Sequence, residues 1–218
     1  MSVDAIEVPS EQELPLFPLH VVLFPGGILP LHIFEERYQL MIQLCLEQES
    51  PFGVVLIKEG TETGEPAKPY LVGTAVQILE VNRLSDGRMN LMTTGQYRFE
   101  ILEIQHDLPY LVGRVRIPIV PDVDVNDDFE PITSEARELY REYEALLKQL
   151  YIEWEPPREI PENPRHLAYQ IGVRLHISLE EKQQLLETFP LNQLLAEEIA
   201  LLERENHRLR ARVIAQNN

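Results

Sequence analysis

The sequence has little cysteine and little positive charge. Among its 218 residues there is one cysteine, Cys45, and 19 Lys and Arg stand against 36 Asp and Glu, a net charge of −17. A single cysteine excludes an intrachain disulfide and a zinc site built from several cysteines, and it fits a reducing compartment. Because nucleic-acid binding draws on clustered Lys and Arg, the acidity argues against a nucleic-acid partner. We expect a cytoplasmic protein.

The N-terminal sequence contains no sign of export or membrane insertion. Residues 1–13 hold three Glu, one Asp and no Lys or Arg, so they lack the positive start of a secretory signal and are expected to form a flexible tail. The apolar stretch 14–34 contains four prolines and the Gly26-Gly27 pair. Prolines would break a helix repeatedly, and an open strand cannot cross lipid. The stretch predicts buried strands and turns, with no membrane partner.

The first half of the chain, residues 14–120, has the pattern of a β domain. Short runs rich in Val, Ile and Leu alternate with Pro, Gly and Asp. Spacings of three and four between apolar residues predict one helix, over 35–48. Asp86-Gly87 predicts a hairpin turn with two positive φ angles. The expected strands are 52–57, 73–83, 88–94, 96–105 and 111–120.

The second half changes to a helical pattern. Residues 121–131 are acidic and proline-containing and predict a linker, and residues 132–218 predict a helical bundle. The expected helices cover 134–151, a segment opening at Asn163-Pro164, a segment capped by Ser178 and Glu181, and 190–215. A β domain followed by a helical bundle predicts an α+β protein.

Residue types that carry chemistry are present but lack catalytic or metal-binding spacing. None of the six serines lies in a nucleophile motif, and the six histidines show no metal-ligand spacing. Cys45 falls on the apolar face of its helix and is expected in the core. No Lys follows a Gly, which excludes a phosphate-binding P-loop. These observations predict a binding module without a catalytic site, metal or cofactor.

The last helix carries a heptad pattern with two possible meanings. A polar Asn within an apolar seam is typical of two-stranded coils, so the pattern predicts a possible homodimer through this helix. The alternative is a helix packed in its own bundle, with the arginine-rich end 204–212 projecting toward an acidic partner. The seam consists of Leu195, Ile199, Leu202, Asn206, Leu209 and Val213.

Residues 14–38 resemble the opening of the N-terminal domain of the ATP-dependent Lon protease family. Two later segments, 73–78 and 95–101, and the glutamate- and leucine-rich helical half are also similar to that family. The residues that carry the resemblance are Pro18, Phe24, Pro25, Gly26, Pro30, Leu31, Tyr38, Gly73, Gly95 and Arg98.

The resemblance implies a PUA-like β pseudobarrel followed by a helical bundle, the part of Lon associated with substrate recognition. The sequence ends where the ATPase would begin in that family, so the resemblance carries over no peptidase activity. It implies a protein that binds other polypeptides, either unfolded substrates or a protease or chaperone, as an adaptor or substrate receptor in quality control.

A PUA-like fold is also compatible with two other functions. One is a small ligand bound in the barrel. The other is RNA binding, which would need a cluster of the arginines Arg83, Arg88, Arg98, Arg114 and Arg116. Tyr70 and Tyr110 follow prolines at similar strand entries, and Met89 lies beside the predicted hairpin turn. These three residues are the expected contacts with a polypeptide.

Overall fold

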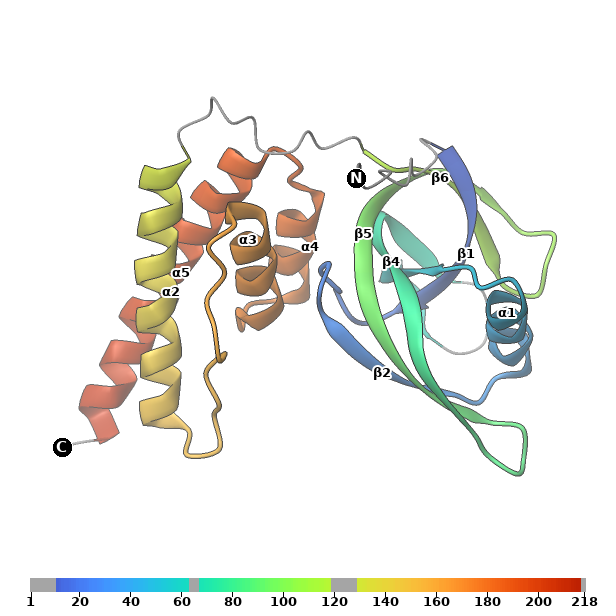
Figure 1. Cartoon of the computed structure of the whole chain (residues 1–218), viewed down its shortest axis with the longest axis horizontal. Coiled ribbons are helices and arrows are strands. Elements are labelled where there is room, and N and C mark those ends of the chain that lie inside the picture. The colour runs from blue at the N-terminus through green and yellow to red at the C-terminus, as the bar shows by residue number, and fades with distance from the viewer. Residues whose placement is uncertain (1–10, 63–66, 119–128, 217–218) are drawn as a thin grey trace, which may run out of the picture. The chain divides into compact units, whose positions relative to one another are not determined.

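The computed structural model describes residues 11–62, 67–118 and 129–216 and divides the chain into two compact units, 1–119 and 120–218 (Figure 1). We call them the β unit and the helical unit. Of the expected tail, residues 1–10 lie outside the described residues, as do residues 121–128 of the expected linker. The tail prediction is wrong for residues 11–13, which already belong to the first strand.

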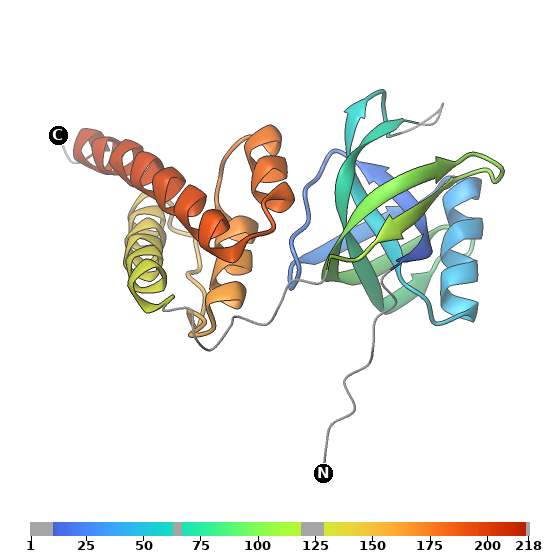
Figure 2. The ribbon, with the colours of Figure 1, turned by 90° about the horizontal axis from the view of Figure 1, so that it is seen from above.

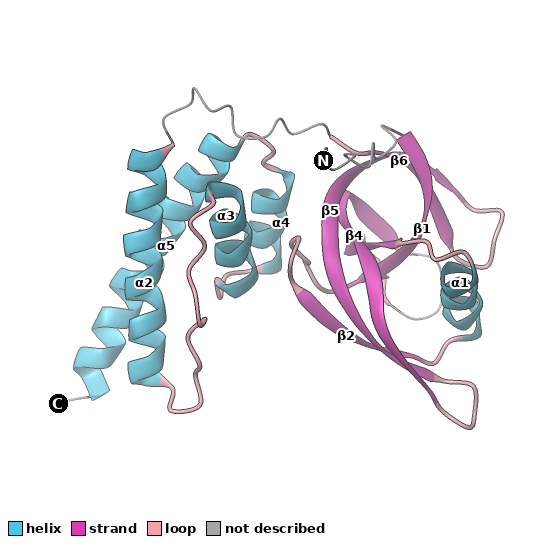
Figure 3. Ribbon diagram, viewed as in Figure 1, coloured by secondary structure: helices cyan, strands magenta, loops and turns pink. Residues whose placement is uncertain are grey.

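The β unit is a barrel of strands with one helix (Figure 3). The strands run in the order β2-β5-β4-β3-β1-β6, and β6 also pairs with β5. Five strands therefore close on themselves, while β2 pairs with β5 alone among the described strands. Of the pairings between described residues, β1–β3 alone is parallel. The elements are β1 (Glu11–Leu19), β2 (Ile28–Ile33), α1 (Glu36–Glu47), β3 (Phe52–Glu59), β4 (Lys68–Arg83), β5 (Met89–Gln105) and β6 (Leu111–Arg116). The α+β fold is confirmed.

Strand β5 closes the barrel because it is long enough to pair with two strands on one edge. Its first part pairs with β2 and its last part with β6. The sequence predicted two strands separated at Gly95, and this was wrong. Gly95 lies within the continuous strand, at a shift in the β4–β5 register. A Cβ at this position would lie 2.5 Å from the Phe24 carbonyl oxygen, so only glycine admits the loop before β2.

The hairpin between β4 and β5 is present, but its turn differs from the prediction. Gly87 has a φ of 89°, whereas Asp86 is not among the residues with positive φ. The Gly87 N–H donates to the Leu84 carbonyl at 3.1 Å, and the Leu84 N–H donates to the Arg88 carbonyl at 2.8 Å. Three residues therefore form the loop, and one glycine in the left-handed region is enough to close it.

The core of the β unit consists of two apolar clusters. In the first, Tyr38, Met41, Ile42 and Cys45 of α1 pack with side chains of the strands, which confirms the predicted helix and its inward face. The second is centred on Phe99, which is fully buried among residues of five strands. Burial of these side chains is the main stabilising contribution to the unit.

The helical unit contains α2 (Glu130–Leu150), α3 (Pro164–Arg174), α4 (Leu179–Glu187) and α5 (Leu191–Gln216) (Figure 2). The predicted starts of α3 and α4 are confirmed, whereas α2 begins at Glu130, four residues before the predicted start and within the expected linker. Asn163 accepts hydrogen bonds from the backbone N–H groups of the first turn of α3, and Ser178 and Glu181 form a capping box. Among the described helices, none is both long and apolar enough to cross a membrane.

The seam of α5 is occupied within the unit. Leu195, Leu202 and Leu209 are at most 7% exposed, and Asn206 is 1% exposed. The Asn206 side chain donates a hydrogen bond to the carbonyl of Leu139 in α2 at 2.9 Å. In this structure the seam is therefore not free to form a two-stranded coil with a second chain. The seam packs within its own unit because the apolar stripe of α5 is wider than a two-stranded coil needs: Leu191 and Leu194 are also buried.

Candidate functional site

The structure places two of the three expected contact residues in the core. Met89 is 2% exposed and Tyr110 is 5% exposed, and both belong to the cluster around α1. They have almost no surface for a partner, because Met89 at the start of β5 and Tyr110 in the bend before β6 both pack in this cluster. Tyr70 is half-buried, and the Lys58 ammonium lies 5.8 Å from the centre of its ring. A contact role for Tyr70 stays a prediction.

Most of the residues that carry the Lon resemblance are also internal. Phe24, Tyr38 and Arg98 are at most 5% exposed, and Pro18 and Pro25 are buried. The Gly26 N–H donates to the Gly95 carbonyl, and the Gly95 N–H donates to the Gly27 carbonyl, both at 2.9 Å. These residues hold the loop between β1 and β2 on the barrel. Among them, Pro30 is exposed on β2 and Leu31 beside it is half-buried.

Pro30 belongs to an exposed surface on three strands, which we call the outer face. It consists of Ile28, Pro30 and His32 on β2, Asn90 and Met92 on β5, and Glu80 and Asn82 on β4. The pairing register aligns these residues in rows: Pro30 lies opposite Met92, which lies opposite Glu80 on the next strand. A second row contains His32, Asn90 and Asn82. Because side chains alternate along strands, all of them point away from the core.

The outer face is apolar along β2 and polar along β4. Ile28 is 57% exposed and Met92 is 36% exposed. Phe34 continues the line beyond β2, with 52% exposure and its ring 6.0 Å from that of His32. His32 and Asn90 are joined by a hydrogen bond of 2.7 Å between Nδ1 and Oδ1. A hollow of about 410 Å³ lies over these strands. Contiguous exposed apolar side chains mark interaction sites.

Pro30 also determines how a chain could bind here. A proline within a paired strand turns its nitrogen to the unpaired edge, where it offers no N–H donor. The free edge of β2 therefore lacks a donor at its centre, which hinders the addition of a further strand. Side-chain contacts across the outer face are the remaining mode of binding.

The five arginines considered for RNA binding have other roles in the structure. Arg88, Arg114 and Arg116 form ion pairs with carboxylates of Asp86, Glu11, Glu103 and Glu100. Arg98 is 5% exposed. Arg83 directs a guanidinium N–H to the sulfur of Met89 at 3.7 Å. The residues lining the hollow on the outer face include no Lys or Arg. Phosphate binding needs such groups.

Two residues with potentially reactive side chains, Cys45 and Ser178, have structural positions in the described part of the chain. Cys45 is 2% exposed, and burial raises the pKa of its thiol to about 11, so the nucleophilic thiolate is suppressed. Its predicted core position is confirmed. Ser178 is used as a helix cap. No group of three His, Cys, Asp or Glu side chains in the described part could hold a metal ion.

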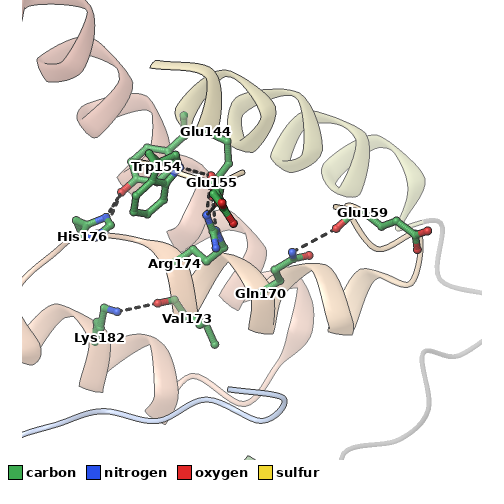
Figure 4. A network of polar contacts seen from close by, with 10 residues as sticks. Glu144, Trp154, Glu155, Glu159, Gln170, Val173, Arg174, His176 and Lys182 are labelled. Carbon is green, nitrogen blue, oxygen red and sulfur yellow. Dashed lines mark hydrogen bonds and ion pairs between the residues drawn. The ribbon is translucent and has the colours of Figure 1, made fainter. Parts of the chain in front are cut away.

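The helical unit contains a polar network around Glu144, shown in Figure 4. Glu144 is 3% exposed and accepts hydrogen bonds from Arg174 at 2.6 and 3.0 Å and from the Trp154 indole at 2.8 Å. Arg174 also donates to the Glu155 carbonyl at 2.8 Å, and its guanidinium lies 4.7 Å from the Trp154 ring centre. The network fixes the segment after α2 onto α3. The sequence contained no spacing signal for it, because its members are far apart in the chain.

Comparison with known proteins identifies the family. A family model described as the ATP-dependent protease La (LON) substrate-binding domain matches residues 13–204. The chain belongs to this family. It is 32% identical to the Lon protease of Anaeromyxobacter dehalogenans over 201 residues, 90% of this chain and 24% of that protein. It is 29% identical to Lon protease 2 of Myxococcus xanthus, over 91% of this chain and 24% of that protein. The chain thus spans about a quarter of the length of these curated relatives.

Solved structures agree with this assignment. A Lon N-terminal domain protein from Xanthomonas campestris has a TM-score of 0.65 and 27% identity, covering 87% of this chain and 98% of that one. The N-terminal domain of a Mycobacterium avium complex Lon protease has a TM-score of 0.62 at 18% identity, covering 88% and 98%, and supports the fold alone. The Lon resemblance read from the sequence is confirmed. The sequence and the fold of this chain are thus those of the Lon substrate-binding domain family.

Proposed function

We propose that the outer face of the β unit binds segments of other polypeptides, and that the chain acts as an adaptor or substrate receptor in protein quality control. The observation that carries this proposal is the exposure of three apolar side chains of the outer face: Ile28 and Pro30 on β2, and Met92 on the adjacent strand β5. The family's description as the substrate-binding domain of a protease supports it, because the substrates of a protease are polypeptides. A cytoplasmic location, favoured by the single cysteine, belongs to the same proposal.

Binding to an unfolded protein tests the proposal. Fluorescein-labelled casein should show a saturable rise in anisotropy on addition of the protein. Met92→Glu should weaken this binding about tenfold, because it places a charge where the bound segment would cover an apolar side chain. Leu102→Glu is the matched control, since Leu102 lies on the same strand at the same 36% exposure but outside the outer face. Equal loss in both variants would contradict a role for the outer face.

The proposal includes that this chain has no catalytic activity of its own. The absence of a Gly-Lys pair and the buried Cys45 support this part. Incubation with ATP and casein should release neither phosphate nor casein fragments. A turnover that disappears in one Ser→Ala variant would contradict it.

A small ligand is a second candidate, favoured by a separate hollow of about 570 Å³ between the end of α1 and strands β4 and β5. Amide side chains line it: Gln12 donates to the Tyr97 hydroxyl at 2.7 Å, and Gln96 donates to Gln77 at 3.1 Å. Such walls suit a neutral polar molecule. A compound that raises the melting temperature of the protein but not of Gln96→Ala would support this function.

A further inference from the structure

The helical unit contains a pocket with aromatic walls. Its volume is about 400 Å³, enough for one aromatic side chain with space at the mouth. It lies between the end of α2, the segment after it, the residue that follows α3 by two positions, and the second half of α5. The lining residues are Tyr143, Leu147, Tyr151, Glu153, Trp154, His176, Glu205, Leu209 and Arg212.

Two polar groups on the pocket's rings already have partners within the unit. The Tyr143 hydroxyl accepts a hydrogen bond from the His176 backbone N–H at 2.9 Å and lies 3.0 Å from its Nδ1. The Trp154 indole N–H is donated to Glu144 at 2.8 Å. These groups are therefore already engaged and do not call for a polar ligand. The surfaces left for a ligand include the faces and edges of the rings and the side chains of Leu147 and Leu209. Such surfaces suit an apolar ring.

The walls are held in place before any ligand arrives. Trp154 contacts the Arg174 guanidinium, 4.7 Å from its ring centre, and the His176 ring, whose centre is 5.1 Å from that of the indole. Figure 4 shows the side chains of Trp154 and Arg174 both directed to the Glu144 carboxylate, which accepts a hydrogen bond from each. A preformed pocket binds without the entropic cost of ordering its walls.

The pocket lining also includes charges of both signs, and exposed apolar side chains lie beside it. Tyr151, which lines the pocket, is 43% exposed, and Ile152, the next residue in the chain, is 93% exposed, the highest value among the large apolar side chains of the described residues. The Arg212 guanidinium lies 5.6 Å from the Tyr151 ring centre, and Glu153 and Glu205 also line the pocket. An apolar rim beside an apolar pocket is typical of an interaction site. Mixed charges at the rim suit a main chain, which presents both donors and acceptors.

We propose that this pocket binds an aromatic side chain of a polypeptide, as a second contact point separate from the outer face. This inference rests on the proposed function, because the aromatic side chain that fills the pocket would belong to the bound polypeptide. Its walls select for a ring, and its rim would contact the flanking main chain.

Trp154 makes the test direct, because it is the only tryptophan in the chain. Its fluorescence therefore reports on this pocket alone. The probe is the capped peptide Gly-Ser-Phe-Ser-Gly, and the control peptide has Ala in place of Phe. We expect a saturable change in Trp154 emission, and protection of Trp154 from acrylamide, with the Phe peptide only. Equal responses to both peptides, or none to the Phe peptide at millimolar concentration, would overturn the proposal.

Variants of the exposed rim separate binding from folding. Tyr151→Ala removes one wall and should weaken the Phe peptide about tenfold, whereas Tyr151→Phe keeps the ring and should bind as the original protein does. Tyr169→Ala, at a half-buried tyrosine of α3 outside the pocket lining, is the matched control for loss of a tyrosine. Unchanged melting temperatures would exclude unfolding as the cause. If Tyr151→Ala melts early, Ile152→Ala replaces it, with a smaller expected loss of about threefold; unchanged affinity in that variant would overturn the proposal.

The outcomes distinguish this inference from the proposed function. If casein binding depends on Met92 but the Phe peptide leaves Trp154 unaffected, the pocket proposal fails and the outer face stands. If the Phe peptide binds but Met92→Glu leaves casein binding unchanged, the pocket stands and the outer face fails. A Trp154 change that grows with protein concentration in the absence of peptide would mean that a second copy fills the pocket, and would overturn the proposal.

Discussion

The side chain of Asn206 in α5 donates a hydrogen bond to the main-chain carbonyl of Leu139 in α2, at 2.9 Å. Both helices contribute to the buried seam at this point, and Asn206 is 1% exposed. Nearby, the Arg210 guanidinium forms a bidentate ion pair with Glu142 of α2 at 2.5 and 2.6 Å. The polar residue that made the heptad pattern look like a dimer seam thus fixes α5 on a helix of the same chain.

Asn206→Ala should therefore destabilise the helical unit without changing the mass of the protein. The loss leaves a buried carbonyl without this donor, and we expect about 1–3 kcal/mol less free energy of unfolding. Urea unfolding followed by Trp154 fluorescence measures this. Light scattering should give the same mass for both proteins. A mass that halves on substitution would contradict the intramolecular seam and restore the zipper.

The arginine-rich end of α5 shows what a sequence can and cannot reveal about charge. Read along the chain, residues 204–212 form a basic handle for an acidic partner. In the structure, Arg204 pairs with Glu181 and Glu205, and Arg210 pairs with Glu142. The carboxylates on α4 and α2 are distant in sequence, so no local pattern could assign them. Helix starts were predictable, in contrast, because Asn163 and Ser178 cap within three residues of themselves.

The outer face was missed for a different reason. Pro30 and Leu31 were identified through resemblance, but Ile28 and Met92 have ordinary apolar identities and gave no signal singly. Strand alternation could have placed them outward once the register was known, because Ile28, Pro30 and His32 alternate with Leu29 and Leu31. The register itself depends on β2 pairing with β5, some 60 residues later in the chain, where Leu29 lies opposite Thr93.

Gly95→Ala should destabilise the β unit by about 1–3 kcal/mol. The added methyl group would lie 2.5 Å from the Phe24 carbonyl oxygen and 3.1 Å from the Thr74 side chain. The Thr74 hydroxyl donates to the Leu23 carbonyl at 2.5 Å, so the same loop is held from both sides. Urea unfolding followed by far-ultraviolet circular dichroism should show the loss.

Gly87→Ala is the control for the Gly95 substitution. Its φ of 89° makes a side chain costly, but nothing nearer than 3.8 Å would meet the new Cβ. We expect a loss of about 1 kcal/mol, from backbone strain alone. A larger loss for Gly87→Ala than for Gly95→Ala would contradict the close approach of the loop to β5.

His176 should make the helical unit less stable at mildly acidic pH. Burial lowers the pKa of its imidazole, with further lowering by Lys182 and Arg174. The unfolded chain therefore binds the proton more readily than the folded one, so stability is full above pH about 6.5 and declines as the pH falls through that value. The urea midpoint of Trp154 fluorescence should be lower at pH 5.5 than at pH 7.5. His176→Gln should flatten this part of the profile, and an unchanged profile would contradict the assignment.

Cys45 should resist thiol reagents in the folded protein. The thiolate is the reactive form, and burial raises the pKa of this thiol to about 11, so at pH 8 roughly one thiol in a thousand is ionised. Its 2% exposure also denies access to a reagent. Reaction with an aromatic disulfide at pH 8 should be slower than in 6 M guanidinium chloride by at least about a hundredfold.

Because Cys45 lies in the cluster around α1, the reaction rate in native buffer also reports opening of the β unit. Gly95→Ala should speed it by the factor that matches its loss of stability, and Asn206→Ala, in the other unit, should not. Equal acceleration by both substitutions would contradict the separate cores of the two units.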